Sequence, residues 1–482
     1  MPESTLKDML LQGPVHLVGI KGTGMSALAE LLHHRGVRVS GSDTAEEFYT
    51  DGILRDLRIP YREGFSPDNI PADTLLVVRS AAYTGENNPE CAAAVKRRLP
   101  LASYPEALGA FAEAFRFAGI AGIHGKTTTT AMVGTMLKET ALPVSVLVGS
   151  SVPAFHDRST WSGGKDFFVA ETCEYRRHFL NFKPRWIVVT NVEADHLDYF
   201  KDADDVLDAF TEYAAGLEPE GELIYCADDP GAVNLAARMT KARPDVNLIP
   251  YGFNAEGEYR LISAETQPGR SVFTLAGVGE LTLRLPGRHM ILNAAAAAAL
   301  SRRMLAFHFG QVDEDSWEKA RQSLAGYSGC RRRTEILGEA GGILFIDDYG
   351  HHPTEIRTTL EGYREFYPHR RRVVDFMSHT YSRTEKLLDG FARAFEAADL
   401  VILHAVYASA REKVGNVDGL RLYEEVKKHH RKVVYFPGVM EAADFCRKEL
   451  QPGDLFITMG AGNNWVLGRS LYDSLRQEEG IR

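Results

Sequence analysis

The segment GIHGKTTTT, residues 122–130, holds the side chains most able to do chemistry. It follows an apolar stretch, FAGIAGI, and precedes a helical stretch, TTTAMVGTMLKE. Backbone N–H groups in such a turn point inward, and the positive end of the helix adds to the attraction, so an anionic phosphate is favoured there. Lys126 can reach the β- and γ-phosphates of a nucleotide, and Thr127 can hold a magnesium ion. We therefore predict a nucleotide-binding loop made by Gly122, His124, Gly125, Lys126, Thr127 and Thr128.

The glycine pattern of this loop is incomplete. The full GxxxxGK[ST] pattern requires glycine where this chain has Ile120. Because a GK[ST] tripeptide is common by chance, the alternative is a helix that merely begins with glycine and threonine. The strand before the loop, the helix after it and Gly122 three residues upstream favour a nucleotide site.

Two further side chains fit a metal site next to this loop. Glu171 ends the strand-like stretch FFVAE, and His196 follows the apolar stretch RWIVVTNV within TNVEADHLDYF. Ligands collect at the carboxyl ends of strands in an open α/β sheet. Magnesium prefers oxygen ligands and accepts an occasional imidazole. We predict that Thr127, Glu171 and His196 converge on Mg²⁺, with Mn²⁺ as the alternative ion. Without these neighbours, His196 would be expected to have a surface or structural role.

A second glycine loop lies near the N-terminus. Residues 22–27, GTGMSA, satisfy GxGxxA after the strand-like stretch VHLVGI, and Asp43 ends the next strand. Such a loop can cradle a diphosphate by the same helix-terminus effect. The pattern alone also fits a nicotinamide-dependent oxidoreductase, although nothing downstream resembles a hydride-transfer site, and it fits a tight turn without a ligand. The predicted substrate contacts here are Gly22, Thr23, Gly24, Asp43 and Ser80.

Strand-like and helical stretches alternate along most of the chain, which is typical of parallel α/β domains. The 482 residues suffice for roughly two to four domains. Residues 245–285 differ, because strands and turn residues dominate there, and this predicts a small antiparallel sheet. The predicted domains are 1–107, 108–328 and 329–482.

Composition restricts the class of protein. A net charge of −10 and a pI near 5.9 argue against a broad nucleic-acid-binding face. The five cysteines are scattered without a CxxC pair, which indicates a reduced protein without disulfides or a zinc site. The N-terminus is polar, and the longest apolar stretches are of strand length. We therefore predict a cytoplasmic protein that neither binds nucleic acid nor inserts into a membrane.

Taken together, these motifs resemble those of the Mur ligase family. They occur in the order found in that family and extend over nearly the whole chain. Within the family, the chain is most similar to the branch that joins L-alanine to UDP-N-acetylmuramate. The segments that carry the likeness are VGIKGTGMSALAELL, GIHGKTTTT, VAET-x-E (169–174), TNVEADHLDYF (190–200), LPGRHMILNAAAA (285–297) and IDDYGHHPTE (346–355).

The resemblance implies a three-domain, ATP-dependent carboxylate–amine ligase. Its N-terminal domain would be a Rossmann-like UDP-sugar domain, its central domain a P-loop ATPase-like fold with a parallel and a small antiparallel sheet, and its C-terminal domain Rossmann-like. ATP would phosphorylate the lactoyl carboxylate of UDP-N-acetylmuramate to an acyl phosphate. The amine of L-alanine, glycine or serine would then attack, in peptidoglycan precursor synthesis. The partners would be these substrates, and the protein a monomer or homodimer.

The resemblance also implies roles for residues of the third segment and its neighbours. Formation of an acyl phosphate brings two anions together, so cationic groups must lie near them. Arginine suits an amino-acid carboxylate because its planar fork binds two oxygens. The implied roles are ATP contacts for His289, Asn293, Arg332, Arg333 and Asp348, substrate contacts for Tyr349, His351, His352, His379 and Arg383, and catalytic roles for Lys126, His196 and Arg383.

Some positions depart from the family's pattern. Cys173 stands where relatives carry an acid, residues 149–167 form a short stretch, and Thr380 replaces a basic residue. The nature of the amino acid therefore stays open. An alternative within the family is the ligase that recycles murein tripeptide, which should carry a longer insertion after Glu171. A binding module that has lost catalysis is a third alternative, and the presence of Lys126 argues against it.

Overall fold

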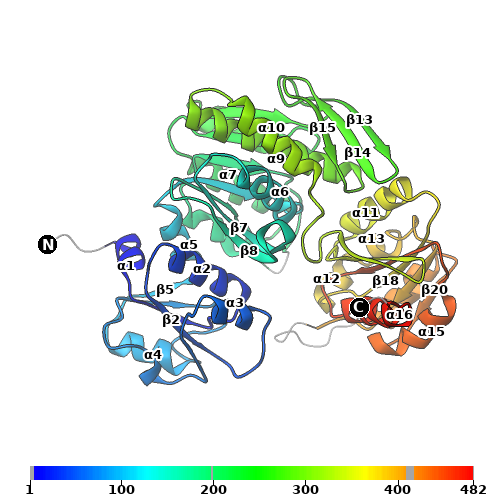
Figure 1. Cartoon of the computed structure of the whole chain (residues 1–482), viewed down its shortest axis with the longest axis horizontal. Coiled ribbons are helices and arrows are strands. Elements are labelled where there is room, and N and C mark those ends of the chain that lie inside the picture. Colours follow the sequence, from blue (N-terminus) through cyan, green and yellow to red (C-terminus); the bar gives the residue numbers. More distant parts are fainter. Residues whose placement is uncertain (1–4, 197–198, 409–416, 481–482) are drawn as a thin grey trace. The chain divides into compact units, whose positions relative to one another are not determined.

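The computed structural model describes residues 5–196, 199–408 and 417–480 (Figure 1). The chain forms two compact units. One comprises the residues up to Leu261 together with Ala295–Ser323, and the other comprises Ile262–Ala294 and the residues from Leu324 onward. Each unit is described by itself.

The first unit begins with a five-stranded parallel sheet in the order β3-β2-β1-β4-β5. Leu17 and Val78 pack in one core with helices α2 and α5, whereas Val18 and Val77 pack in another with Cys91 of α4. Both faces are thus covered, as apolar parallel strands require. The elements are α1 Leu6–Gln12, β1 Val15–Val18, α2 Thr23–His34, β2 Val39–Asp43, α3 Thr50–Asp56, β3 Tyr61–Glu63, η1 Pro67–Asn69, β4 Leu76–Arg79, α4 Pro89–Lys96, β5 Leu101–Ser103 and α5 Tyr104–Ala112.

A seven-stranded sheet follows in the order β12-β11-β10-β6-β9-β7-β8, with all neighbours parallel except the edge pair β7 and β8. Strand β6 lies between β9 and β10, so the segments after these three strands emerge at one edge. The elements are β6 Arg116–Ala121, α6 Lys126–Lys138, β7 Val144–Val152, η2 Pro153–Phe155, β8 Arg158–Ser162, β9 Phe167–Glu171, η3 Tyr175–Asn181, β10 Trp186–Val189, α7 Ala203–Ala215, β11 Glu222–Cys226, α8 Pro230–Ala242 and β12 Asn247–Tyr251.

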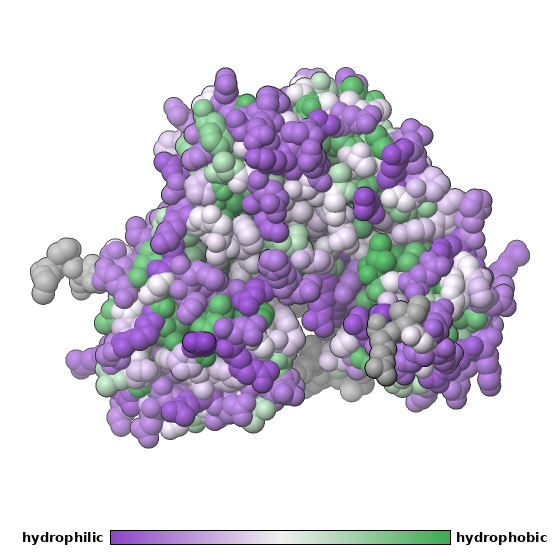
Figure 2. All heavy atoms as spheres, in the orientation of Figure 1, coloured by the Kyte–Doolittle hydropathy of each residue, from purple (hydrophilic) through white to green (hydrophobic). Residues whose placement is uncertain are grey.

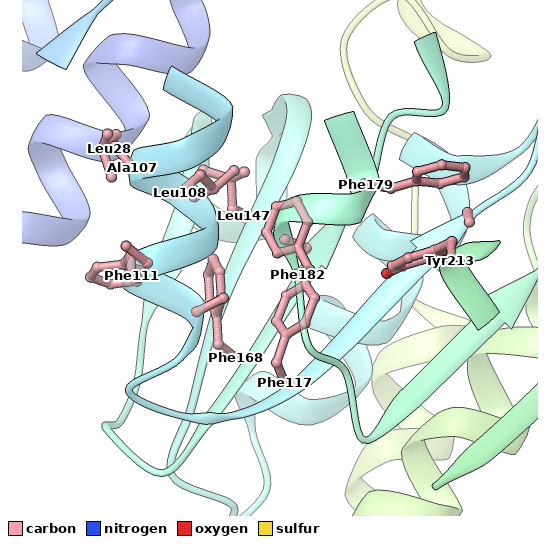
Figure 3. Packing of buried hydrophobic residues seen from close by; sticks show 14 of the residues in the cluster. Leu28, Ala107, Leu108, Phe111, Phe117, Leu147, Phe168, Phe179, Phe182 and Tyr213 are labelled. Carbon is pink, nitrogen blue, oxygen red and sulfur yellow. The ribbon is translucent and has the colours of Figure 1, made fainter. Parts of the chain in front are cut away.

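Aromatic side chains join these two sheets within the first unit (Figure 3). Phe111 of α5 meets Phe168 of β9 edge to face, with ring centroids 5.3 Å apart. Phe117 stacks on Phe182 at 4.9 Å. Apolar residues from both sheets belong to one core. Arg158 adds an ion pair between the two sheet regions, because its Nη1 lies 2.6 Å from Oε1 of the buried Glu30 on α2.

The second unit contains a six-stranded sheet in the order β16-β17-β21-β18-β19-β20, parallel except for the edge pair β16 and β17. Leu344 and Ile346 face one core, and Ile343 and Phe345 face another, as the period-2 geometry of β17 dictates. The elements are β16 Glu335–Ala340, β17 Ile343–Asp348, α11 Pro353–Phe366, β18 Arg371–Phe376, α12 Tyr381–Lys386, α13 Leu388–Ala392, β19 Leu400–Leu403, α14 Gly419–Lys427, β20 Val433–Tyr435, η4 Val439–Ala442, α15 Ala443–Glu449, β21 Asp454–Met459 and α16 Trp465–Glu478.

A small three-stranded sheet, β13-β14-β15, precedes this part of the chain. It consists of β13 Leu261–Gln267, β14 Arg270–Leu275 and β15 Gly279–Leu283, and the β14–β15 pair is antiparallel. The sequence prediction of an antiparallel sheet is therefore confirmed. Its predicted beginning was too early, because Asn247–Tyr251 forms β12 of the parallel sheet. The three predicted domain boundaries stay a prediction.

Helices α9, Arg288–Phe309, and α10, Glu314–Ala325, complete the fold. Among the described residues, α9 is the one helix long and apolar enough to cross a membrane, but 72% of its apolar window is buried, as in the core helix of a soluble protein. Residues Ala294–Ala299 are fully buried, so this part of the helix packs closely against its neighbours. On the face seen in Figure 2, hydrophilic residues predominate, with apolar residues in scattered groups.

Candidate active site

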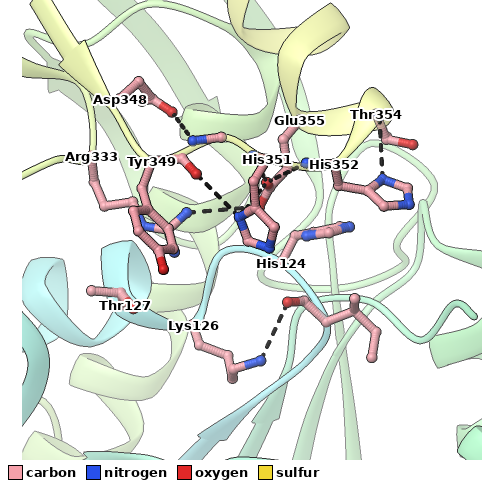
Figure 4. Close-up of polar contacts among 12 residues, drawn as sticks. His124, Lys126, Thr127, Arg333, Asp348, Tyr349, His351, His352, Thr354 and Glu355 are labelled. Carbon is pink, nitrogen blue, oxygen red and sulfur yellow. Dashed lines mark hydrogen bonds and ion pairs between the residues drawn. The ribbon is translucent and has the colours of Figure 1, made fainter. Parts of the chain in front are cut away.

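The phosphate loop lies between the central strand β6 and helix α6 (Figure 4). Gly125 caps the helix with φ at 85°, and Gly122 has φ at 137°. Both values favour glycine. A Cβ on Gly122 would also lie 2.0 Å from Oγ1 of Thr190, at the end of β10. The loop backbone therefore lies close against the neighbouring strand end, as a phosphate cradle requires.

Asn191 and Thr190 fix this loop from β10. The backbone N–H of His124 donates to Oδ1 of Asn191 at 2.9 Å, and Nδ2 of Asn191 donates to the carbonyl of His124 at 3.1 Å. The Thr190 hydroxyl donates to the same carbonyl. The ring of His124 lies 2.8 Å from Glu193. The sequence prediction missed Thr190 and Asn191, although both belong to the TNVEADHLDYF motif.

Lys126 forms a charge pair within the loop. Its Nζ donates to Oε2 of the buried Glu174 at 2.8 Å and to the carbonyl of Ile123 at 3.3 Å. Burial would lower the pKa of Lys126, but the charge and hydrogen bond of Glu174, together with the nearby Glu171, outweigh burial and raise that pKa. Burial would likewise raise the pKa of Glu174, but Lys126 and a hydrogen bond from His196 hold it below its ordinary value. Both groups are therefore charged at neutral pH.

The predicted metal ligands gather beside this pair. The Thr127 hydroxyl donates to Oε2 of Glu171 at 2.8 Å. Nε2 of His196 lies 3.3 Å from Oε1 of Glu174, and its backbone has φ at 51°, in the left-handed region. Such a conformation in a histidine is uncommon and recurs at functional sites. A hydroxyl, two carboxylates and an imidazole form a donor set that suits Mg²⁺, and Glu174 is a candidate ligand that the sequence prediction missed.

Gly149 leaves the space that this carboxylate cluster needs. A Cβ at Gly149 on β7 would lie 1.9 Å from Oε1 of Glu171. Any larger residue would displace the carboxylate. The short stretch at residues 149–167 thus begins with a glycine that leaves space for a carboxylate of the predicted metal site.

The N-terminal glycine loop opens α2, with Gly22 as its cap. Asp43 is buried, and its two oxygens accept backbone N–H groups from Lys21 at 2.7 Å and Thr44 at 2.8 Å. Asp43 therefore orders the loop in this structure, and its contact with a substrate stays a prediction. Ser80 lies beside the loop, because a Cβ on Gly19 would meet its Cβ at 2.9 Å.

Lys21 is a buried cation that the sequence prediction missed. Its Nζ lies 3.2 Å from Asp51 and 3.1 Å from Glu63. It also donates to the carbonyl of Glu46 at 3.1 Å. These contacts hold the segment after β2 against the glycine loop, where the Tyr49 hydroxyl donates to Oγ1 of Thr23 at 3.2 Å.

A cavity of about 280 Å³ extends from the N-terminal glycine loop to Glu171 within the first unit. Its polar lining includes Thr23 and Tyr104 on one side and Glu171 on the other. Leu108 and Leu147 contribute apolar walls. A ligand held by the glycine loop can therefore extend toward the carboxylate cluster.

In the second unit, Asp348 ends β17 and holds two loops (Figure 4). Oδ2 of this residue accepts the N–H of Thr334 at 2.8 Å, and Oδ1 accepts that of Gly350 at 2.8 Å. Arg332 pairs with Asp347 at 3.2 Å, and the guanidinium of Arg333 lies 5.0 Å from the ring centroid of Tyr349. The predicted ATP-contacting arginines and Asp348 thus lie around one strand end.

The adjacent histidines after this strand have different surroundings. His352 caps α11, because its Nδ1 accepts the N–H of Thr354 at 3.3 Å, while Glu355 completes the capping box. Nδ1 of His351 lies 3.1 Å from the carbonyl of Tyr349, and burial lowers the pKa of His351 to about 4. His351 is therefore a neutral ring near physiological pH. The substrate contacts of both residues stay predictions.

His289 and Asn293 lie near the start of α9. Burial lowers the pKa of His289 to about 4, and Asn293 is buried. A Cβ on Gly287 would lie 2.8 Å from Nδ1 of His289, so the histidine ring folds over the turn before the helix. A neutral imidazole and an amide are suitable partners for a base edge, and their contact with adenine stays a prediction.

The predicted amino-acid pocket combines the end of β18 with α12. His379 stacks on Tyr407 with centroids 6.0 Å apart, and the N–H of Thr380 donates to the carbonyl of Tyr407 at 3.0 Å. Arg383 lies on α12, one turn later. Tyr407 was not predicted, because it follows a different strand, β19, and only the sheet brings it to His379.

Comparisons with known proteins agree with this arrangement. Three family descriptions match consecutive parts of the chain: Mur ligase family, catalytic domain, at residues 14–116; Mur ligase middle domain at residues 120–301; and Mur ligase, glutamate ligase domain, at residues 332–462. The chain belongs to the Mur ligase family. The α/β fold predicted from the resemblance is confirmed, and the nicotinamide-dependent oxidoreductase alternative is rejected.

Several Mur ligases are similar over the full length. UDP-N-acetylmuramate–L-alanine ligase of Treponema pallidum is 50% identical, over 99% of this chain and 100% of the relative. The ligase of the same name from Desulfitobacterium hafniense is 41% identical over 95% and 99%. The crystal structure of UDP-N-acetylmuramate-alanine ligase MurC of Thermotoga maritima aligns with a TM-score of 0.76 at 25% identity, covering 96% of this chain and 99% of that one.

Proposed function

We propose that this Mur ligase uses ATP to join L-alanine to the lactoyl carboxylate of UDP-N-acetylmuramate, in peptidoglycan precursor synthesis. The observation that carries the proposal is that Glu171 accepts a hydrogen bond from Thr127 of the phosphate loop and also lines the 280 Å³ cavity that reaches the glycine loop. The names of the full-length relatives support the choice of substrates. The proposed enzyme is cytoplasmic and acts as a monomer or homodimer.

The phosphate loop would bind the triphosphate of ATP. Its backbone N–H groups and the N-terminus of α6 attract phosphate oxygens. The Lys126 ammonium, now paired with Glu174, is within the loop and can turn to a phosphate oxygen. Thr127, Glu171 and His196, with Glu174, would hold Mg²⁺, which when bound neutralises phosphate charge.

The first chemical step would join two anions. An oxygen of the lactoyl carboxylate attacks the γ-phosphorus, a new O–P bond forms, and the bond to the β-phosphate oxygen breaks to release ADP. Lys126 offsets the negative charge that develops on the transferred phosphoryl group. In the second step, the amine of L-alanine attacks the acyl carbon and inorganic phosphate leaves. No covalent enzyme intermediate is needed.

The second unit would supply the remaining contacts. We propose that His289 and Asn293 contact adenine, and that Arg332, Arg333 and Asp348 act near the phosphates. Arg383 would bind the α-carboxylate of the amino acid, since its guanidinium offers two parallel donors. The proposed substrate-site residues of this unit are Tyr349, His351, His352 and His379.

Release of ADP and phosphate tests the proposal. Turnover should require UDP-N-acetylmuramate and an amino acid together, and L-alanine should be preferred to glycine and serine. Discrimination by one methyl group is expected to be roughly 10- to 200-fold. Lys126→Ala should abolish turnover. No product with any of these amino acids, but turnover with the murein tripeptide, would instead assign the recycling reaction.

A further inference from the structure

The cavity in the first unit is small for a ligand pocket. Its volume is about 280 Å³, whereas ligand pockets commonly enclose roughly 300–1,000 Å³. It lies between the glycine loop, which suits a diphosphate, and Glu171, beside which the reacting carboxylate would lie. The part of the substrate between those two points is the muramyl group.

Tyr104 lines this cavity and is held in place from two sides. It is the first residue of α5, whose start is fixed by the Ser103 and Glu106 capping box. Its ring lies on the glycine loop, because a Cβ at Gly24 would come within 2.8 Å of Cζ and 3.0 Å of the phenol oxygen. Gly24 is therefore needed for the ring to lie there. Packing of the ring therefore fixes the position of the phenol oxygen.

The Tyr104 hydroxyl makes no hydrogen bond to another residue in the part of the chain that the structure describes. Burial, together with the nearby charge of Glu171, raises the pKa of Tyr104 well above its ordinary value. The phenol is thus a neutral donor at physiological pH. Partly buried tyrosine hydroxyls usually have a partner, and a bound ligand in the cavity can supply one.

The rest of the cavity wall is largely apolar. Leu108 and Leu147 line it near Tyr104. An apolar wall favours a methyl group, since burial of one is worth about as much as burial of a methylene. The muramyl group offers two methyl groups, on its lactoyl and acetamido substituents, next to oxygens that accept hydrogen bonds.

We propose that Tyr104 is a substrate-binding residue, whose hydroxyl donates to an oxygen of the muramyl group while Leu108 and Leu147 receive a methyl group. The inference rests on the proposed function and adds a specificity-determining contact to it. The contact acts on the muramyl group and not on the uridine diphosphate, because Tyr104 lines the cavity that extends from the glycine loop to Glu171, beside which the reacting carboxylate would lie.

Tyr104→Phe tests this contact without disturbing the ring packed on Gly24. Equilibrium binding is measured for two probes, UDP-N-acetylmuramate and UDP, with a non-hydrolysable ATP analogue present. Loss of one hydrogen bond should weaken binding of UDP-N-acetylmuramate by up to roughly tenfold, and UDP binding should stay within about twofold. KM for ATP should not change. Tyr225→Phe, which removes a hydroxyl from a half-buried tyrosine of β11 outside the cavity, is the matched control.

The outcomes separate this inference from the proposed function. If Tyr104→Phe binds both probes as the wild type does, the contact is absent and the inference is wrong. If both probes weaken equally, Tyr104 acts through the glycine loop, and the inference is again wrong. Failure of the proposed function would appear differently, as a wild-type protein that forms no ADP with UDP-N-acetylmuramate and L-alanine.

Discussion

The ammonium of Lys126 lies 2.8 Å from the carboxylate of Glu174, inside the phosphate loop region. The second oxygen of that carboxylate faces His196. Glu174 therefore holds a cation of the phosphate loop and a predicted metal ligand at the same time. A buried carboxylate with two such partners sets the position of both.

Glu174→Gln should keep the size of this side chain and remove its charge. Lys126 and His196 then lose their common partner, and kcat should fall roughly 10- to 100-fold, the effect of one charge-assisted hydrogen bond. Steady-state kinetics against ATP measure this. Glu212→Gln, at an exposed ion pair with Arg177, is the matched control and should retain activity. A Glu174→Gln enzyme with wild-type kcat would show that the pair has no part in turnover.

Gly149→Ala should displace the carboxylate of Glu171, because the new methyl would lie 1.9 Å from Oε1. Misplacement by about 1 Å can lower a rate about 100-fold. The Mg²⁺ concentration for half-maximal activity should also rise. Gly85→Ala, where a Cβ meets no atom within 4 Å, provides the control. Unchanged Mg²⁺ dependence in Gly149→Ala would argue against Glu171 as a metal ligand.

His404 and Asp375 form a fully buried pair in the second unit, with 2.7 Å between Nε2 and Oδ2. Burial would lower the pKa of His404, but the charge and hydrogen bond of Asp375, together with the carbonyl of Phe436, outweigh burial and raise that pKa. A raised pKa in the folded state means that the pair stabilises fully below the unfolded pKa, about 6.5. This contribution is lost as pH rises through the folded pKa.

Asp375→Asn should therefore lower stability more at pH 6 than at pH 9. Breaking a buried pair costs roughly 3–5 kcal/mol at the lower pH, read from the urea midpoint. Glu425→Gln on the surface of the same unit should show no pH-dependent difference over this range, since the pKa of Glu425 is lowered and its titration lies in acid. An Asp375→Asn deficit that grew with pH would contradict the assigned direction.

The sequence predicted the sites that depend on a strand and the loop directly after it. Lys126, Thr127 and Glu171 follow from motif and strand end, and the structure brings them together. Asn191 was missed because its role depends on the loop of a neighbouring strand. Tyr104 was not predicted, because only the packing of α5 on Gly24 brings its side chain to the cavity wall.

Asp43 shows a role that the sequence did not predict. Its place at the end of β2 predicted a substrate contact, which stays a prediction, and the structure adds a role in ordering the loop, because both oxygens accept backbone N–H groups. A pattern of residues defines which side chains are near a loop. It does not show which of these side chains accept hydrogen bonds from the protein's own backbone, because those hydrogen bonds form only after the loop has its tertiary conformation.

Transfer of oxygen from substrate to phosphate tests the acyl phosphate most directly. UDP-N-acetylmuramate labelled with ¹⁸O in its lactoyl carboxylate is incubated with the protein, ATP, Mg²⁺ and L-alanine. The carboxylate oxygen that attacks the γ-phosphorus stays with that phosphorus when the amine displaces it. The account predicts one ¹⁸O atom in each released phosphate, and unlabelled phosphate released together with the alanyl product would contradict it.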